Sequence, residues 1–471
     1  MRPLLIPFLF ALACSKPPPN TVRRPDVFLI VVDTLRADHL GCYGYPRPTS
    51  PNLDRLAAEG AVFEDATSQA SWTRLSMVSM LQGHYVTDYR DVFEEKAPTL
   101  AEVFHQAGYR TVGVVANILL SADAGFGRGF DHYDARGPSK EDKASDGLTR
   151  NATAIFRDLG PEIESEGRGA RPPLFVYVHL MDPHSPYLQH AQFAAELPLD
   201  GAAPIPELQR ELFSRQGAPA PAEDPGWSRA WESMQEARGR YDQEIRFADA
   251  EIGLFLDRLR AKGLLDHAVV ALVADHGEVL HEQTAMMRPD ELAKSAPDAF
   301  FQREHGAFLF QSLVHTPFIL WGEGIAKGSR VKEPVENVDL FPTVVALAGL
   351  RSPTGLHGHA LVGAPTVSRE EVCAFVRQTA AVRETATNLK LTVPTEYGKT
   401  LGARPTLFSL SEDPAETRDL YSQRPEDVER LRQRLTEWIR RYPTSSGLHR
   451  KKDAKEIGDL SKLGYAGEDK K

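Results

Sequence analysis

The amino-acid sequence predicts an α/β protein: an α/β/α sandwich with a mostly parallel central sheet, followed by a small C-terminal α+β domain. Three observations support this prediction. Apolar runs with the length of strands alternate with amphipathic helical segments. These runs are almost continuously apolar, as in parallel strands that are buried on both faces. The chain has 471 residues, 42% of them hydrophobic, which is enough to bury one large and one smaller core.

Five short apolar runs are the expected strands of the large sheet. The first, "DVFLIVVD", ends in an aspartate. The five runs cover residues 26–33, 111–116, 174–180, 268–274 and 317–321. Because helical patterns lie between them, we expect most of these strands to run in the same direction.

Three segments between the strand runs carry helix signals. "SPNLDRLAAEG" begins with a capping serine and ends in glycine, and "APTLAEVFHQAG" follows a similar pattern. The longer "YDQEIRFADAEIGLFLDRLRAKG" has one apolar face, formed by Ile245, Ala248, Ile252, Phe255, Leu256 and Leu259. Residues 185–238 and 283–303 lack such periodicity, so we expect long connections there that shape the substrate entrance.

The pattern changes after "VDLFPTVVALAGL". Short strand-like pieces, "EEVCAFVRQ", "NLKLTVP" and "TLFSLS", precede an amphipathic helix over "PEDVERLRQRLTEWIRRY". The sequence therefore predicts a large domain over residues 26–350 and a small α+β domain over residues 351–443. Residues 444–471 are charged and contain glycine and serine, which indicates a flexible tail.

Residues 1–25 have the pattern of a lipoprotein-type signal and linker. A basic start and a short apolar run lead to small residues before Cys14, and a proline-rich stretch follows. The apolar run is too short for a stable transmembrane helix, and cleavage before Cys14 would leave a thiol for lipid attachment. An ordinary cleaved secretory signal is the alternative. Both predict export, and the first predicts a membrane-anchored lipoprotein that faces the periplasm or the cell surface.

The charge and the cysteines exclude other classes. A net charge of −10 argues against nucleic-acid binding, although a local basic cleft for an anionic substrate is compatible with it. Besides Cys14 the chain has only Cys42 and Cys373, so at most one disulfide can form and stability must come from the core. The oligomeric state is left open.

Acidic residues follow two of the expected strands. In an open parallel sheet, ligands collect at the carboxyl ends of the strands. Asp33 ends the first strand run, and Asp275 and His276 follow the fourth in "VADHGE". Two carboxylates and an imidazole at one edge can bind a single cation. The alternative is that these acids cap loops or helices.

"SWTRLSMVSMLQG" places Thr73 at the start of a helical segment. An isolated threonine in that position usually caps exposed backbone N–H groups. If Thr73 also lies beside a cation, the metal lowers the pKa of its hydroxyl, and the helix N-terminus favours the alkoxide and an incoming anion. The pattern thus allows a nucleophile as well as a cap.

Histidines near the third and fifth strand runs are candidates for contact with a substrate. "HLMDPHSPY" contains His179, Asp182 and His184, and "REHGAFLF" contains His305. Such histidines can donate hydrogen bonds to an anionic ester or protonate its leaving group. Each of them taken singly is also compatible with a structural or surface role.

Taken together, these segments resemble the sulfatase family within the alkaline phosphatase superfamily. The resemblance covers most of residues 26–350 and rests on an ordered series: "IVVDTLRADHLGCYGY", "SPNLDRLAAEGAVFEDA", "SWTRLSMVSMLQG", "HLMDPHSPY", "YDQEIRFADAEIG", "VADHGE", "HGAFLFQSLVHTPFILWG" and "VENVDLFPTVVALAGL". The later "LFSLSEDPAETRDLY" is similar to a signature of the small domain that sulfatases carry. The resemblance implies an alkaline phosphatase-like fold and a catalytic domain over residues 26–350.

The resemblance also implies roles for single residues. The family's metal-ligand positions fall on Asp33, Asp275 and His276, and its nucleophile position, beside the metal, falls on Thr73. Its substrate-binding or leaving-group positions fall on His184 and His305. The implied cofactor is one divalent metal ion, with Mn²⁺ or Ca²⁺ favoured and Mg²⁺ or Zn²⁺ also compatible.

Several positions depart from the sulfatase pattern. Sulfatases have Cys or Ser followed by x-Pro-x-Arg, and that first residue is oxidised to formylglycine. Here the positions read Thr73, Leu75 and Met77, and threonine cannot yield the same aldehyde because its oxidation would give a ketone. Thr34 also replaces the second aspartate of the usual pair. Relatives with a threonine nucleophile, such as lipoteichoic acid synthases and phosphoethanolamine transferases, resemble this arrangement.

The leading hypothesis is a metal-dependent sulfatase-family hydrolase that cleaves a sulfate or phosphate ester through Thr73. Asp38, His39 and Glu278 are further candidates for the metal shell, and Arg36 for the anion, with surface roles as the alternative for all four. A phosphoryl-head-group transferase at the membrane surface and a non-catalytic binding homologue are the competing hypotheses. The multi-helix anchor common in such transferases is absent from the sequence, and retention of the site residues argues against a non-catalytic protein.

Overall fold

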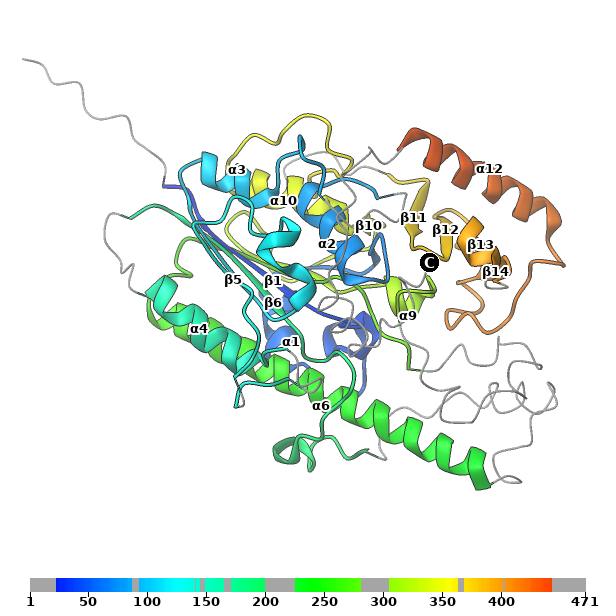
Figure 1. Cartoon of the computed structure of the whole chain (residues 1–471), viewed down its shortest axis with the longest axis horizontal. Coiled ribbons are helices and arrows are strands. Elements are labelled where there is room, and N and C mark those ends of the chain that lie inside the picture. Colours follow the sequence, from blue (N-terminus) through cyan, green and yellow to red (C-terminus); the bar gives the residue numbers. More distant parts are fainter. Residues whose placement is uncertain are drawn as a thin grey trace, which may run out of the picture.

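The computed structural model describes residues 23–86, 93–139, 141–144, 149–164, 171–199, 225–280, 305–362, 368–400 and 403–442, with only the backbone in 225–234. Most of residues 1–25, the predicted signal and linker, lie outside these residues, and so do the whole of the predicted tail and the 283–303 connection. The large domain is an α/β/α sandwich and a small sheet follows it in the chain, so the predicted fold class is confirmed (Figure 1).

An eight-stranded sheet forms the centre of the large domain, in the order β5-β4-β6-β1-β7-β8-β2-β9. Only β8 runs against the others. The strands are β1 (Asp26–Val32), β2 (Ala61–Phe63), β4 (Arg110–Val115), β5 (His132–Asp134), β6 (Leu174–Leu180), β7 (Ala268–Ala274), β8 (Phe318–Gly322) and β9 (Ser329–Val331). The central β1 is buried along its whole length because helices cover both faces of the sheet.

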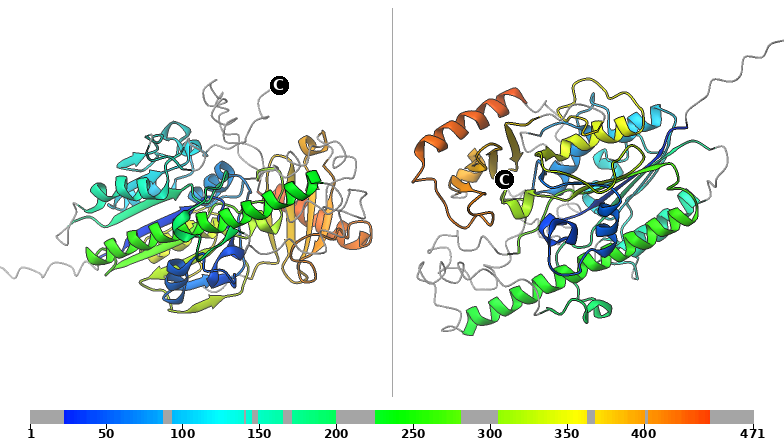
Figure 2. Two further views of the ribbon diagram at one scale, coloured as in Figure 1. Left: turned by 90° about the horizontal axis from the view of Figure 1, so that it is seen from below. Right: turned by 180° about the vertical axis from the view of Figure 1, so that it is seen from behind.

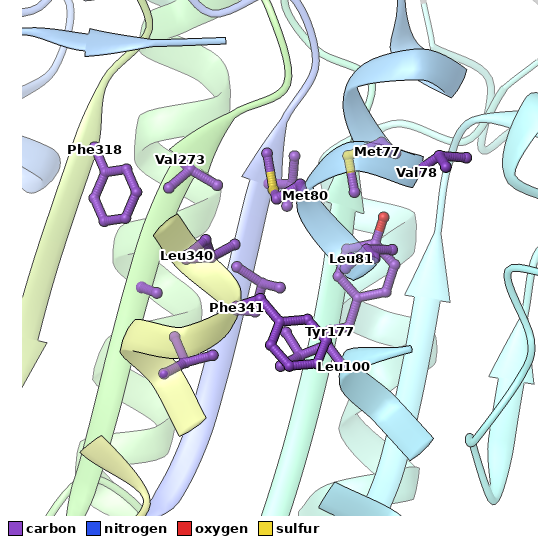
Figure 3. Packing of buried hydrophobic residues seen from close by; sticks show 14 of the residues in the cluster. Met77, Val78, Met80, Leu81, Leu100, Tyr177, Val273, Phe318, Leu340 and Phe341 are labelled. Carbon is purple, nitrogen blue, oxygen red and sulfur yellow. The ribbon is translucent and has the colours of Figure 1, made fainter. Parts of the chain in front are cut away.

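Helices pack on the two faces according to the alternation of side chains along each strand. Phe28, Ile30 and Val32 face α1 (Pro51–Ala58), α4 (Ala152–Glu164) and α6 (Pro225–Ala261). Val27, Leu29 and Val31 face α2 (Thr73–Gln82), α3 (Leu100–Gln106) and α10 (Leu340–Leu347). Figure 3 shows this second layer, in which α2 and α10 lie side by side on the sheet.

Short elements connect these layers. Two strands of two residues each, β3 (Ala66–Thr67) and β10 (Val335–Glu336), pair with each other in parallel. The remaining short elements of the described part are η1 (Ala37–His39), η2 (Gly41–Tyr43), η3 (Ile118–Leu120), η4 (Ala122–Ala124), η5 (Ala191–Phe193), α9 (Gln311–Val314) and η8 (Asn337–Asp339).

The C-terminal domain is an antiparallel sheet covered by one helix. Its strands are β11 (Glu371–Phe375), β12 (Thr379–Glu384), β13 (Leu389–Pro394) and β14 (Thr406–Ser409), and its helices are α11 (Glu396–Thr400) and α12 (Pro425–Arg441). Leu431, Leu435 and Trp438 of α12 pack on Val382 and Leu391 of the sheet. Figure 2 shows this unit beside the large sheet.

The structure differs from the sequence prediction at the start of helix α6 and in several short strands. Helix α6 begins at Pro225, so residues 225–238 are helical and not part of an irregular connection. Good helix formers fill that stretch, whereas the apolar stripe that marks a buried face starts only near Tyr241. The strands β2, β5, β9 and β12 were not predicted, because their apolar patterns are too short or too weak. Cys42 and Cys373 are both free thiols.

None of the helices in the described ranges is both long enough and apolar enough to cross a bilayer.

Candidate active site

Asp33, Asp275 and His276 meet at the carboxyl edge of the central sheet. Asp33 follows β1 and Asp275 follows the neighbouring β7, whose last residues are paired in register. One ligand atom from each of the three residues lies within 4.8 Å of the others. The Nε2 atom of His276 is 3.7 Å from an oxygen of Asp33 and 3.4 Å from an oxygen of Asp275. The side chain of Asp33 and those of the adjacent Asp275 and His276, far apart in the sequence, form one fully buried group.

The two carboxylates of this group fit a cation. Asp33 Oδ1 and Asp275 Oδ2 are buried and have no hydrogen-bond partner among the described residues. Burial, followed by the charge of Asp275, raises the pKa of Asp33 to about 7. Burial raises the pKa of Asp275 to about 7 as well. Buried acids without compensating charge are costly, so the donor set matches a divalent cation that binds oxygen and nitrogen ligands.

His276 is oriented as a metal ligand would be. Its Nδ1 atom lies 2.8 Å from the carbonyl oxygen of Gly277. Because a carbonyl only accepts, the Nδ1 atom donates, and Nε2 keeps a free lone pair toward the two aspartates. Burial and the nearby His305 lower the pKa of His276 to about 4, which favours the neutral ring that binds metals.

Thr73 is the first residue of α2, and its hydroxyl does not cap the helix. The N-cap residue is Trp72, and no side-chain cap is formed. Instead, the Thr73 hydroxyl lies 3.4 Å from Asp33 Oδ2 and 3.3 Å from His276 Nε2. The capping alternative is therefore wrong, and the hydroxyl lies both beside the acid group and at the positive end of a helix.

Two serines near Thr73 hold the backbone of Asp275 by hydrogen bonds to its carbonyl oxygen. The hydroxyl of Ser76 donates to the carbonyl oxygen of Asp275 at 2.6 Å, and Ser68 donates to the same oxygen at 2.5 Å. Ser79 instead donates to the carbonyl of His84 near the end of α2. Ser76 therefore ties α2 to the residue that follows β7, whereas Ser79 bonds the chain just after the end of α2.

Asn117 belongs to the site and was missed by the sequence analysis. Its Nδ2 donates to Asp33 Oδ2 at 2.8 Å, and its Oδ1 caps η3 by accepting from the N–H of Leu119. Asn117 follows β4, so the rule that polar residues at strand ends mark a site would have found it. An amide side chain is a weaker sign of a cation site than an acid or an imidazole, so the sequence pattern did not single it out.

His184 and His305 lie next to the acid group. The ring of His305 is 4.6 Å from that of His276 and 4.9 Å from that of His184, between ring centroids. Glu278 accepts from His305 Nδ1 at 3.0 Å. Burial acts against ionisation of Glu278, but the charge of His305 and this hydrogen bond lower the pKa of Glu278 to about 2. A negative Glu278 thus holds the ring of His305 toward the site.

The other candidates contact different partners. Asp182 accepts from the N–H of Ala152 and so caps α4, and His39 Nδ1 pairs with Asp242 at 2.8 Å. His179 is buried, with its Nε2 atom 3.9 Å from Asp33 Oδ2. The described group of possible ligands does not include any of these residues.

Arg36, Asp38 and Glu278 were assigned surface roles as alternatives. Arg36 and Glu278 are buried, so that alternative is wrong for them, as it is for the buried His39. The guanidinium of Arg36 donates to both oxygens of Asp38 and to the carbonyl of Glu278. The side chain of Asp38 is 56% exposed, and this residue alone fits the surface description.

The departures from the sulfatase pattern have structural counterparts. Leu75 and Met77 are buried in the apolar layer between α2 and the sheet, and Figure 3 shows Met77 in that layer. An arginine at position 77 would enter an apolar environment here. Thr34 has a φ of 55°, its backbone N–H lies 3.3 Å from Asp275 Oδ1, and Tyr241 donates to its carbonyl at 2.7 Å.

The fold and site define a class of protein: an alkaline phosphatase-like α/β enzyme with a buried carboxylate–imidazole group able to hold a metal ion and an adjacent hydroxyl. The family model "Sulfatase" matches residues 25–350. The chain belongs to the sulfatase family, as the sequence predicted, and is a sulfatase-like ester hydrolase.

Known relatives agree with this assignment. Iduronate 2-sulfatase of Homo sapiens is 26% identical over 397 residues, covering 71% of this chain and 70% of its own. Arylsulfatase A of Homo sapiens is 26% identical over 378 residues, covering 75% of this chain and 68% of its own.

Two solved structures share the fold. The phosphonate monoester hydrolase SpPMH from Silicibacter pomeroyi superposes with a TM-score of 0.64 at 19% identity, covering 89% of this chain and 96% of its own. BT4656 in complex with D-glucosamine-2-N,6-O-disulfate superposes with a TM-score of 0.66 at 19% identity, covering 89% and 98%.

Proposed function

We propose that this protein is a metal-dependent hydrolase that cleaves a sulfate or phosphate ester with Thr73 as the nucleophile. One observation carries the proposal: the Thr73 hydroxyl lies at the N-terminus of α2, within 3.4 Å of Asp33 and 3.3 Å of His276. Asp33, Asp275 and His276 would hold the cation, and Thr73 would border it. The bound cation would lower the pKa of the Thr73 hydroxyl and offset the negative charge of the ester.

Different residues of the chain then attack the ester, protonate its leaving oxygen and stabilise its negative charge. The Thr73 hydroxyl gives up its proton to water, and its oxygen forms a bond to sulfur or phosphorus in line with the ester bond that breaks. His184 and His305 contact the ester oxygens, and one of them gives a proton to the leaving oxygen. Asn117 and the N–H groups at the start of α2 stabilise the anionic group. Water then cleaves the covalent Thr73 ester and restores the hydroxyl.

The formylglycine mechanism of sulfatases is excluded by the residue itself. The hydrated aldehyde of that mechanism forms from Cys or Ser, whereas position 73 is threonine. A covalent Thr73 ester must therefore be released by attack of water on sulfur or phosphorus. That step is compatible with either a sulfate or a phosphate ester.

The names of the relatives support a sulfate, phosphate or phosphonate ester as the class of substrate to test. Two of them are named as sulfatases, one structure contains a disulfated glucosamine as its substrate, and another is a phosphonate monoester hydrolase.

We therefore propose to test sulfate monoesters, phosphate mono- and diesters and phosphonates with protein loaded with Mn²⁺, Ca²⁺, Mg²⁺ or Zn²⁺. Mass spectrometry of residues 71–83 after quenching should detect the added sulfuryl or phosphoryl group in wild type and not in Thr73→Ala. Turnover of every substrate by Thr73→Ala at the wild-type rate would contradict the assignment.

We also propose that the protein is exported and anchored by a lipid on Cys14. The support comes from the leader sequence, with its apolar run and the small residues before Cys14. Metabolic labelling with a fatty-acid analogue should mark wild type and not Cys14→Ser. Absence of label from wild type would leave the secretory alternative, and equal labelling of both proteins would rule out Cys14 as the site of attachment. Product analysis with an added alcohol would then separate hydrolysis from transfer to an acceptor near the membrane.

A further inference from the structure

The C-terminal segment "SEDPAETRDL", residues 411–420, lies outside the proposed site, but one of its acids contacts the large domain. Two acids of the segment hold it in shape: Asp413 accepts from the N–H groups of Thr417 and Arg418, and Asp419 accepts from the N–H of Leu407. Glu416 differs from them because its side chain is fully buried and reaches α9.

Glu416 contacts Gln311, the first residue of α9, directly and also through Lys390. One carboxylate oxygen accepts from the backbone N–H of Gln311. The other lies 2.9 Å from the Nζ atom of the buried Lys390, which itself donates to Gln311 Oε1 at 3.1 Å. Glu416 also has a φ of 55°, an unfavourable conformation for a residue other than glycine. Such a conformation persists where surrounding contacts enforce it, and it often marks a residue that must reach a particular partner.

Helix α9 in turn holds the backbone that follows the metal-ligand group. The carbonyl of Leu313 accepts from the N–H of Gly277 at 2.7 Å, and the carbonyl of Ser312 accepts from the N–H of Glu278 at 3.1 Å. The contact is close, since a Cβ atom on Gly277 would lie 2.0 Å from the Ser312 oxygen. Gly277 is also the residue whose carbonyl accepts from His276 Nδ1.

We propose that Glu416 is a positioning residue, which acts from the C-terminal domain through α9 to orient His276. The sequence of contacts runs from the Glu416 carboxylate to Gln311, through α9 to Gly277, and from the Gly277 carbonyl to the imidazole. A carbonyl that fixes a ligating histidine typically affects metal affinity by tenfold or more. The consequence for metal binding rests on the proposed function, whereas the effect on α9 and residues 277–278 does not.

Two double variants separate positioning from stability. Lys390→Met/Glu416→Gln and Lys390→Met/Glu416→Leu both lack the buried ion pair, so neither leaves an unpaired charge. Only the glutamine keeps an oxygen that accepts from Gln311. Glu412→Gln is the control, since Glu412 lies in the same segment but pairs with the exposed Arg418. Urea unfolding of the full-length variants should confirm that the two doubles have matching stability.

The first readout is hydrogen exchange of the Gly277 and Glu278 amides in metal-free protein, and the second is the Kd for Mn²⁺ from calorimetry. We expect Lys390→Met/Glu416→Leu to exchange about tenfold faster at these amides and to bind Mn²⁺ about tenfold more weakly than Lys390→Met/Glu416→Gln. Glu412→Gln should match wild type in both measurements.

Equal exchange in the two doubles would overturn the proposal, and so would faster exchange with an unchanged Kd. If wild type bound no divalent cation, the proposed function would be wrong. The exchange comparison would then still decide whether Glu416 holds residues 277–278 through α9.

Discussion

Two groups of buried acids in this protein differ in how their charges are compensated. Asp33 and Asp275 carry oxygens without a hydrogen-bond partner in the described part of the chain, and burial raises the pKa of both to about 7. Glu336 and Asp339 are as deeply buried, but Arg369 donates to both, at 2.7 and 2.6 Å. Tyr85 donates a further hydrogen bond to Glu336 at 2.6 Å.

The difference shows what separates a cation site from a structural ion pair. Both groups cost free energy to bury, and within the described residues an arginine compensates only the second of them. The second group, Glu336, Asp339 and Arg369, joins the short β10–η8 segment to the start of the small domain and needs no ligand. The first group keeps carboxylate oxygens without a partner in the described residues, which supports the cation that we propose for it. The two groups should therefore respond in different ways to substitution and to added metal.

Thr73→Ala should have the largest effect and should change activity alone. Removing the nucleophile removes the covalent step, and we expect kcat to fall by at least about 10³-fold, or roughly 4 kcal/mol of transition-state stabilisation. Steady-state kinetics measure this loss, and calorimetry with Mn²⁺ should still detect binding through the three ligands. Retained turnover would show that Thr73 serves only the fold.

Arg369→Met should chiefly affect stability. It leaves Glu336 and Asp339 buried without their counter-charge, which typically costs about 3–5 kcal/mol. Urea unfolding of metal-free protein measures that loss, and the Mn²⁺ affinity of the folded variant should stay within about twofold of wild type. A variant of wild-type stability would mean that this group is no more essential than a surface pair.

Asp275→Asn should weaken metal binding and stabilise the metal-free protein, the reverse of what is expected for Arg369→Met. We expect Mn²⁺ to bind about a hundredfold more weakly, because one charged ligand is lost. A carboxyl whose pKa is 3.8 when unfolded and about 7 when folded contributes stability that is complete below pH 3.8 and is lost as the pH rises through 7. The metal-free variant escapes that loss, so at pH 8 it should unfold at higher urea concentration than metal-free wild type. A lower midpoint would contradict the account of unpaired acids.

The last effect, which is gradual and needs no substitution, is the pH dependence of metal binding in wild type. Below their raised pKa values near 7, Asp33 and Asp275 hold protons that a cation must displace. The Kd for Mn²⁺ should therefore rise by about tenfold or more per pH unit below pH 6 and level off above pH 8. Calorimetry in buffers of different ionisation enthalpy should detect proton release at pH 6. A Kd that is constant from pH 5 to 8 would mean that both acids are already ionised in the metal-free protein.

Much of this arrangement follows from local sequence. Apolar runs predicted β1, β6 and β7, and the polar residues after them predicted Asp33, Asp275 and His276 as one group. The prediction worked because parallel strands that begin on the same side of a sheet also end on the same side. It failed for Asn117 and for the start of α6, where the residue type or the missing apolar stripe gave too weak a signal.

The sequence by itself determined the fold class, the family and the strand ends that carry the ligands, because these depend on periodicity and on ordered motifs. Only the tertiary structure decided that Thr73 faces the acids rather than capping α2, that Asp182 caps α4, and that Arg36, His39 and Glu278 are buried. It also decided that Glu416 reaches α9. These outcomes depend on contacts between segments far apart in the chain, and the physical reason is that burial and hydrogen bonding are set by the packed neighbours of a side chain.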